Sequence, residues 1–187
     1  MGFFVFSLPT HCRVIFCRLL NVNFKKSKKK LFSERLIIRP LTKNDSSFIL
    51  ELVNSEGWLK NIGDRNVHNL VDAEKYVQSI LNNPKYFYYV LEHQKSKETL
   101  GIISFLFREE YQSPDLGFAL LPQFEQKGYA YEACDLFLKE KSLTAMNMKI
   151  IAITKASNLP SISLLMKLGF TKSNQSGNNK LLIFEKD

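Results

Sequence analysis

A turn that leads into a helix at Gly128 is the part of this sequence best suited to bind an anion. The apolar segment Gly117–Leu121 precedes the turn, and Gly128 and Ala130 are small residues where an amphipathic helix begins. The N-terminus of a helix has unpaired N–H groups and partial positive charge, so it favours a pyrophosphate. Gly128 has no Cβ, which lets phosphates approach the backbone. The same residues also fit a tight turn without a ligand.

Three further motifs accompany this turn. In sequence order the four blocks are S-E-R-L-I-I-R-P-L (33–41), P-Q-F-E-Q-K-G-Y-A-Y-E-A (122–133), N-L-P-S (158–161) and K-L-G-F (167–170). Together they resemble the GNAT superfamily of acetyl-CoA-dependent N-acetyltransferases. The closest resemblance is to the branch of the ribosomal-protein N-terminal acetyltransferases (RimJ/RimL-type), and it covers roughly residues 33–187.

The resemblance implies an acyltransferase that moves an acetyl group from acetyl-CoA directly to a primary amine, with no metal. Holding both reactants in one ternary complex supplies about 7–11 kcal/mol of the barrier, so no covalent intermediate is needed. In this superfamily the strand Gly117–Leu121 diverges from Lys149–Thr154, and the pantetheine arm fills the space between them. A backbone N–H of the first strand polarises the thioester oxygen. The implied cofactor-binding residues are Phe118, Ala119, Leu120, Gln126, Lys127, Gly128, Tyr129, Ala130 and Asn158.

Two side chains are implied to take part in catalysis. By resemblance, Asn158 contacts the pantetheine arm, and Ser161 lies near the sulfur, where it protonates or hydrogen-bonds the leaving thiolate. Many other members carry a tyrosine acid seven residues after the asparagine, but this position is Leu165, which favours the serine. The structural alternative is that Asn158 and Ser161 only begin a helix, since both residue types are common there.

Departures from the family pattern support a second hypothesis, a non-catalytic acyl-CoA-binding module. An acid, Glu125, occupies a position that is commonly Gln or Arg, and Gln126 replaces a frequent glycine. Lys127 offsets these changes as a positive charge near phosphate. No residue stands out as the general base: Asp115, Glu109 and Glu110 lie in the right region, but a solvated surface carboxylate is the simpler account of each. A water relay to bulk solvent is an equally plausible route for the proton.

The acceptor site is implied to lie across the sheet from the cofactor, against the loops that follow the first helices. This places Trp58, Asp64 and Arg65 in contact with the substrate. Asp64 would orient an ammonium group; a surface pair with Arg65 is the alternative, and Trp58 would otherwise cover the core. A protein N-terminus, an amino acid, a polyamine and an antibiotic amine all remain open as acceptors.

The positive charge of the chain belongs to its N-terminal part. The net charge is +8, and residues 1–31 contain seven basic and no acidic residues. The other residues are nearly neutral, so RNA binding rests on Lys25–Lys30 alone and no nucleic-acid partner is expected. We therefore expect a basic, poorly ordered extension (1–31), with anchoring at a lipid surface as an alternative, and one domain (32–187). Three cysteines do not make a disulfide framework, so we expect the protein to be cytoplasmic. We expect it to be a monomer or a homodimer.

The elements that must position these residues form an α/β (α+β) pattern. Alternating apolar residues predict strands, helices lie between them, and no second core is visible. Asp72 is expected to cap one helix, and residues 57–65 are expected to form a loop. We predict a single-domain GNAT fold: a mixed, mostly antiparallel sheet, splayed around the cofactor, with helices on both faces. The expected strands are 35–41, 86–91, 99–107, 115–121, 149–154, 170–173 and 180–185.

Overall fold

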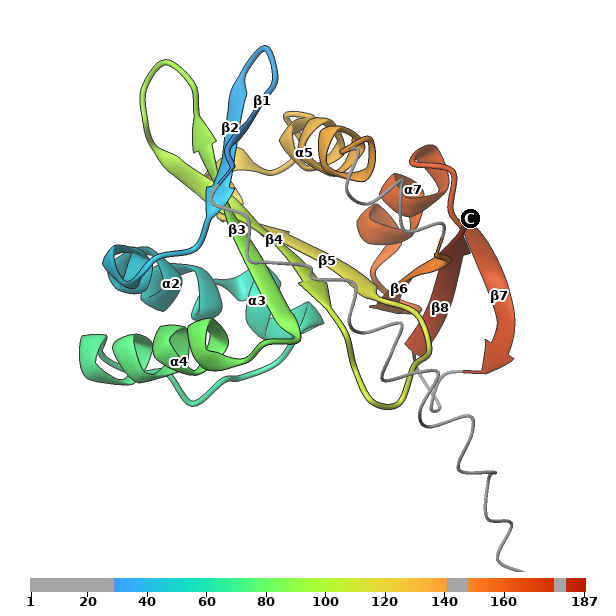
Figure 1. Cartoon of the computed structure of the whole chain (residues 1–187), viewed down its shortest axis with the longest axis horizontal. Helices are drawn as coiled ribbons and strands as arrows, with labels where there is room; N and C mark the ends of the chain where they lie inside the picture. Colours follow the sequence, from blue (N-terminus) through green and yellow to red (C-terminus); the bar gives the residue numbers. More distant parts are fainter. Residues whose placement is uncertain (1–28, 141–147, 177–180) are drawn as a thin grey trace, which may run out of the picture.

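A single sheet of eight strands forms the centre of the protein (Figure 1). The computed structural model describes residues 29–140, 148–176 and 181–187, so the expectations for most of the N-terminal extension lie outside the described residues. The strand order is β1-β2-β3-β4-β5-β6-β8-β7, and every neighbouring pair is antiparallel except β5 and β6. The strands are β1 (Leu31–Phe32), β2 (Leu36–Pro40), β3 (Tyr86–His93), β4 (Thr99–Leu106), β5 (Asp115–Leu120), β6 (Ile150–Lys155), β7 (Thr171–Ser176) and β8 (Leu181–Lys186). The expected mixed, mostly antiparallel sheet is confirmed.

Helices lie on both sides of the sheet. The helices are α2 (Ser46–Val53), α3 (Glu56–Asn61), α4 (Leu70–Asn82), α5 (Tyr129–Leu138) and α7 (Leu159–Lys167), with the short 3-10 helices η1 (Lys43–Asp45) and η2 (Pro122–Phe124). In Figure 1, α2, α3 and α4 gather beside the first strands, and α5 and α7 lie on the other side. Among the described helices, none has the length and apolar character needed to cross a membrane.

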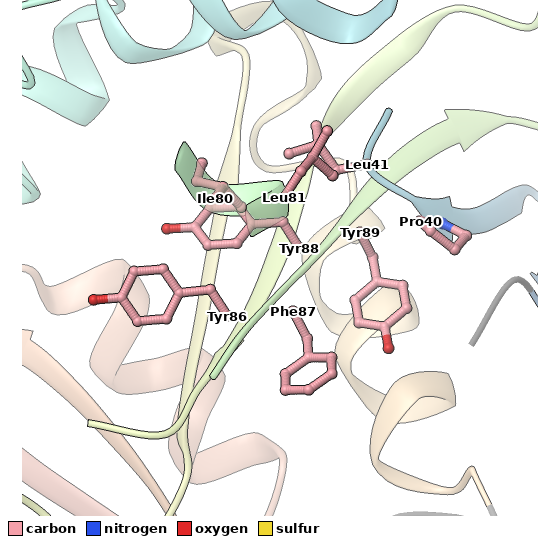
Figure 2. A pocket seen from close by; sticks show the side chains of 8 residues that line it. All are labelled: Pro40, Leu41, Ile80, Leu81, Tyr86, Phe87, Tyr88 and Tyr89. Atoms are coloured by element: carbon pink, nitrogen blue, oxygen red, sulfur yellow. The ribbon is translucent and has the colours of Figure 1, made fainter. Parts of the chain in front are cut away.

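Apolar side chains of β3 point to both faces of the sheet, so both faces need helices to cover them. Phe87 and Tyr89 are buried in the core cluster shared with α5 and α7, whereas Val90 belongs to the cluster under α2, α3 and α4. Figure 2 shows the two sides, with Tyr86 and Tyr88 extending away from Phe87 and Tyr89. The cavity drawn there is about 30 Å³. It holds about two water molecules at most, so it is a packing defect and not a substrate site.

Two local expectations were wrong. The segment expected to be a loop begins with α3, because Gly57 is tolerated in a first helical turn while only Gly63, at φ 102°, requires a glycine. Asn69, not Asp72, is the N-cap of α4: its Oδ1 accepts the N–H of Asp72 at 3.0 Å. Both residue types favour caps, and their spacing of three residues let either be chosen. The short strand β1 was not expected, and the expected domain boundary after residue 31 falls inside it.

A buried ion cluster joins β2, η1 and β3. Arg39 donates from both terminal nitrogens to Asp45, at 2.7 and 3.0 Å, and from Nε to Glu92 at 3.0 Å. Thr42 adds its N–H and its hydroxyl to the Asp45 carboxylate, each at 2.8 Å. Burial by itself raises the pKa of Asp45, but the hydrogen bonds from Arg39 and Thr42 outweigh it and hold that pKa below its usual range.

We expect Asp45→Asn to lower the free energy of unfolding at pH 7 by about 3 kcal/mol, because it leaves a largely buried Arg39 without one partner. The folded-state pKa of Asp45 is depressed, so its contribution is fully present above the unfolded value of about 4 and is lost as pH falls through the folded value. Urea unfolding of both proteins at pH 7, 5 and 3 measures this. A stability difference that does not shrink between pH 5 and 3 would contradict the assignment.

Candidate active site

The strands β5 and β6 begin side by side and then diverge. They pair only at Asp115 and Ile151, where the N–H of Ile151 donates to the carbonyl of Pro114 at 2.9 Å, whereas β5 pairs with β4 along its whole length. The N–H of Leu121 donates to the carbonyl of Leu100 at 2.8 Å. By the alternation of a strand, the N–H groups of Phe118 and Leu120 therefore face the divergence. The expected splay of the sheet is confirmed.

The turn after β5 delivers the chain to an uncapped helix N-terminus. Gly128, at φ 81°, is the N-cap of α5 and has no side-chain cap. The N–H groups of Tyr129, Ala130 and Tyr131 occupy the first turn and have no intrahelical acceptors. A Cβ at Gly128 would stand 3.4 Å from Nη2 of Arg35. The end of α5 thus has the donors, the dipole and the bare backbone that an anion such as a pyrophosphate requires.

Gln126 adopts a left-handed conformation, with φ 57°. This explains the glycine that related sequences often carry at the same place, since glycine adopts positive φ without a steric penalty. A side chain there costs about 1–2 kcal/mol of backbone strain. Gln126 therefore adds a modest backbone strain to the turn that a glycine at the same position would not carry.

Arg35 clamps this turn and was not identified from the sequence. Its Nη1 donates to the carbonyl of Lys127 at 3.0 Å, and its guanidinium lies 4.5 Å from the ring centroid of Tyr129. Its Nε and Nη2 contact Oε2 of Glu132 at 2.7 and 2.6 Å. Oε1 of Glu132 accepts from the hydroxyl of Ser33 at 2.6 Å. Glu132 is in the family block and Arg35 in the bend between β1 and β2, and their separation of 97 positions in the sequence conceals the pair.

Several hydrogen bonds keep Glu132 ionised at the start of α5. Burial by itself raises the pKa of Glu132, and the hydrogen bonds from Ser33 and Arg35 outweigh it, so the net shift is downward. A carboxylate in the first turn competes with any anion bound there. Here its charge is already matched by Arg35.

The two other charges of the turn have separate surroundings. The Nζ of Lys127 lies 5.7 Å from the ring centroid of Phe124 and is exposed. Oε1 of Glu125 lies 3.0 Å from where a Cβ of Gly57 would stand, so this carboxylate rests against α3. The acid that departs from the family pattern therefore has a structural neighbour outside the turn.

Asn158 and Ser161 begin α7, close to the end of β6. Oδ1 of Asn158 accepts the backbone N–H of Ser161 at 3.3 Å, which makes Asn158 the N-cap. The hydroxyl of Ser161 is half-buried and makes no hydrogen bond within the part of the chain that the structure describes. Leu165, where a tyrosine acid would stand, is 1 % exposed and belongs to the core. The capping role thus falls to Asn158 and leaves its Nδ2 and the Ser161 hydroxyl available.

The expected acceptor residues surround α3. Trp58 is 5 % exposed, and its Nε1 donates to the carbonyl of Gly63 at 3.1 Å. Arg65 is exposed, with its guanidinium 6.0 Å from the Trp58 ring centroid. Asp64 accepts the N–H of Asn66 at 2.7 Å, and no ion pair among the described residues joins it to Arg65. The Nζ of Lys155, at the end of β6, donates to the carbonyl of Lys60. Helix α3 therefore touches both sides of the divergence, through Lys155 and through Glu125.

Of the three carboxylates considered as a base, Asp115 departs from expectation. It is 5 % exposed and accepts from Nε of Arg108 at 2.7 Å, so it is not a solvated surface group. Burial raises the pKa of Asp115, against the lowering effects of Arg108 and of the N–H of Ile153. Glu109 is exposed and paired with Lys85 at 2.9 Å, and Glu110 is exposed. No cluster of three or more potential metal ligands occurs among the residues described.

Comparisons with known proteins agree with this geometry. The family model "Acetyltransferase (GNAT) domain" matches residues 35–171. An uncharacterised N-acetyltransferase, YoaA, of Bacillus subtilis (strain 168) is 23 % identical over 146 residues, which cover 76 % of this chain and 82 % of that protein. The ribosomal-protein-S5-alanine acetyltransferase of Vibrio fischeri superposes with a TM-score of 0.71 at 16 % identity, over 84 % of this chain and 96 % of that one. RimL, a ribosomal L7/L12 α-N-protein acetyltransferase solved with coenzyme A, gives 0.71 at 15 % identity, over 84 % and 97 %. The chain belongs to the GNAT acetyltransferase family.

Proposed function

We propose that this acetyltransferase moves an acetyl group from acetyl-CoA directly to a primary amine within a ternary complex. The observation that carries the proposal is the position of the uncapped α5 N-terminus at the end of β5, beside the divergence of β5 from β6. An extended pantetheine arm fits between two strands that stop pairing, with its pyrophosphate on the backbone N–H groups of Gln126 to Ala130. Acetyl-CoA would supply the thioester carbonyl that the amine attacks.

In this proposal the residues of the chain position the two substrates and polarise the thioester. The N–H of Phe118 or Leu120, which faces the divergence, donates to the thioester oxygen and stabilises the charge that develops on it. The Nδ2 of Asn158 donates to the pantetheine arm, while its Oδ1 caps α7. The Ser161 hydroxyl donates a proton or hydrogen bond to the sulfur as it leaves. No carboxylate is assigned as the general base in this proposal. Water molecules carry the proton of the amine to solvent instead.

The acceptor would approach along α3. This helix touches both sides of the divergence, and the exposed Asp64 and Arg65 follow it directly. Asp64 would orient the amine, whereas the buried Trp58 would support α3 from the side of the core. The names of the ribosomal-protein acetyltransferases with the same fold favour a protein N-terminus as acceptor. The free, fully buried thiol of Cys134 is compatible with the reducing cytoplasm as the setting.

The test is acetyl-CoA turnover with a panel of amines: an alanine-first peptide, a free amino acid, a polyamine and an aminoglycoside. We expect CoA to be released in the presence of one of the α-amines, the alanine-first peptide or the free amino acid. Mass spectrometry should then find one acetyl group on the amine of that acceptor. Initial rates at varied concentrations of both substrates should give intersecting lines, which indicate a ternary complex. Parallel lines would contradict direct transfer. CoA binding in calorimetry without turnover of any amine would instead identify a non-catalytic acyl-CoA-binding module.

A further inference from the structure

An open groove lies along the side of α5 that faces away from the core. Its volume is about 540 Å³, and its lining includes Gly128 and the residues of α5 that follow it, Ser33 and Arg35 before β2, and Lys167 of α7. None of the buried residues of α5 lines it. Pockets for small molecules occupy about 300–1,000 Å³, so the groove is large enough for one. Because it includes Gly128, the N-cap of α5, it adjoins the proposed pyrophosphate site.

The charged side chains of the groove leave one cation unmatched. Arg35 pairs with Glu132 at 2.6 Å, and Lys139 pairs with Asp135 at 2.7 Å. Lys167 is exposed, and no carboxylate whose position the structure describes forms an ion pair with its Nζ. The lining of the groove therefore carries one net positive charge, which comes from Lys167. An unmatched positive charge in a groove attracts an anionic ligand.

The ammonium group of Lys167 lies over the ring of Tyr131. Its Nζ is 4.3 Å from the ring centroid, which is the geometry of a cation–π contact between α7 and α5. Tyr131 is in the first turn of α5 and follows Gly128 by a rise of about 4.5 Å along the helix. An ammonium group has three N–H donors, and a contact with one ring face leaves donors for an oxygen ligand. The free charge of the groove is therefore held beside the first turn of α5.

Coenzyme A has a third phosphate group that suits this position. Its adenosine carries the pyrophosphate on the 5′ oxygen of the ribose and a separate phosphate on the 3′ oxygen. With the pyrophosphate on the N–H groups around Gly128, the adenosine can continue into the adjoining groove. A phosphate monoester carries about 1.5 to 2 negative charges at pH 7. The 3′-phosphate would therefore find its strongest free partner of the groove in Lys167.

We propose that the groove holds the 3′-phosphoadenosine of CoA and that Lys167 distinguishes CoA from cofactors that lack the 3′-phosphate. The inference rests on the proposed function for the position of the pyrophosphate, and it adds a residue that sets the specificity for the cofactor. Lys167 contacts the nucleotide, far from the thioester, so it is a specificity residue and not a catalytic one. The simpler role, a solvated lysine whose methylene groups pack on Tyr131, gives no preference between the two cofactors.

The experiment measures by calorimetry the Kd of CoA and that of dephospho-CoA, which lacks only the 3′-phosphate. We expect the wild type to bind CoA about tenfold more tightly, because a hydrogen bond between two charged groups is worth about that factor. Lys167→Met keeps an unbranched side chain against Tyr131 but removes the charge, so the two Kd values should come within about twofold of each other. Lys167→Arg restores a cation and should restore most of the preference.

Lys172→Met is the matched control. It removes the same charge from an exposed lysine of β7 that does not line the groove, so it should keep the preference of the wild type for CoA. An undiminished preference in folded Lys167→Met, or no preference in the wild type, would overturn the role of Lys167 and leave the proposed function standing. An equal loss in Lys167→Met and Lys172→Met would also overturn it, because the effect would then belong to the net charge of the protein.

Two nucleotides without a pantetheine arm separate this inference from the proposed function. In NMR titrations we expect adenosine 3′,5′-bisphosphate to bind the wild type more tightly than AMP, and Lys167→Met to lose the difference. If this preference is found but CoA does not bind, the groove is supported and the proposed pantetheine site is contradicted. If none of the four ligands binds, both the groove and the proposed function are wrong.

Discussion

Gly128→Asp is expected to abolish CoA binding, with the Kd raised about a thousandfold. The carboxylate would stand within about 4 Å of a pyrophosphate on the α5 N-terminus, and like charges at that distance repel by about 4 kcal/mol at the effective dielectric constant of a protein surface. Isothermal calorimetry with CoA measures the loss. The domain should stay folded, because aspartate tolerates the left-handed region better than most residues.

Gly128→Asn is the matched control for this experiment. Asparagine has the shape of aspartate and a similar tolerance for the φ of 81° at this position, but it carries no charge. Both variants add a Cβ 3.4 Å from Arg35, so they share any strain and any movement of the clamp. The Kd of Gly128→Asn should therefore rise much less than that of Gly128→Asp. Equal affinities in the two variants would mean that no phosphate lies at this helix end.

Ser161→Ala is expected to lower kcat by about 10²–10⁴-fold with little change in the KM for acetyl-CoA, because general acid catalysis acts only as charge builds on the leaving sulfur. The hydroxyl makes no hydrogen bond within the described residues, and the cap of α7 comes from Asn158. The melting temperature should therefore stay that of the wild type. Steady-state kinetics and a thermal melt of the same sample separate the two effects.

Two variants of the same helix sharpen this test. Ser163→Ala removes an exposed hydroxyl two residues further on and should leave kcat unchanged. Asn158→Asp keeps an oxygen that caps the helix but loses the Nδ2 donor, so it should raise the KM for acetyl-CoA more than it lowers kcat. If Ser161→Ala turns over at the wild-type rate, the hydroxyl has no part in the chemistry and water protonates the thiolate.

The sequence was most informative where function depends on neighbouring residues. The turn, Gly128 and the following helix are adjacent in the chain, so their types and order predict an anion site directly. The divergence of β5 and β6 could be expected only through the family resemblance, because no residue pattern shows that a ladder stops. Helix α3 was missed because it is only six residues long and contains Gly57, so its sequence has the composition of a loop.

Contacts between distant segments could not be predicted. Arg35 and Glu132 are 97 residues apart, and each alone has the pattern of an ordinary surface charge. Asp115 was expected on the surface as a carboxylate at the start of a strand, and its burial depends on how the preceding connection brings Arg108 to it. Pairings of this kind are fixed by the tertiary fold, and a single sequence carries no record of them.

The clamp between Arg35 and Glu132 also bears on the order in which the molecule matures. Closing a contact across 97 residues requires most of the intervening strands and helices to be in place, so it forms late in folding. Until then the turn at residues 125–128 is free to sample other conformations, and binding would have to pay the entropy of ordering it. Once Arg35 has docked on Glu132 and on the carbonyl of Lys127, that entropy has already been lost. A newly made chain should therefore acquire its affinity for CoA only at the final stage of folding, when Arg35 meets Glu132 of α5.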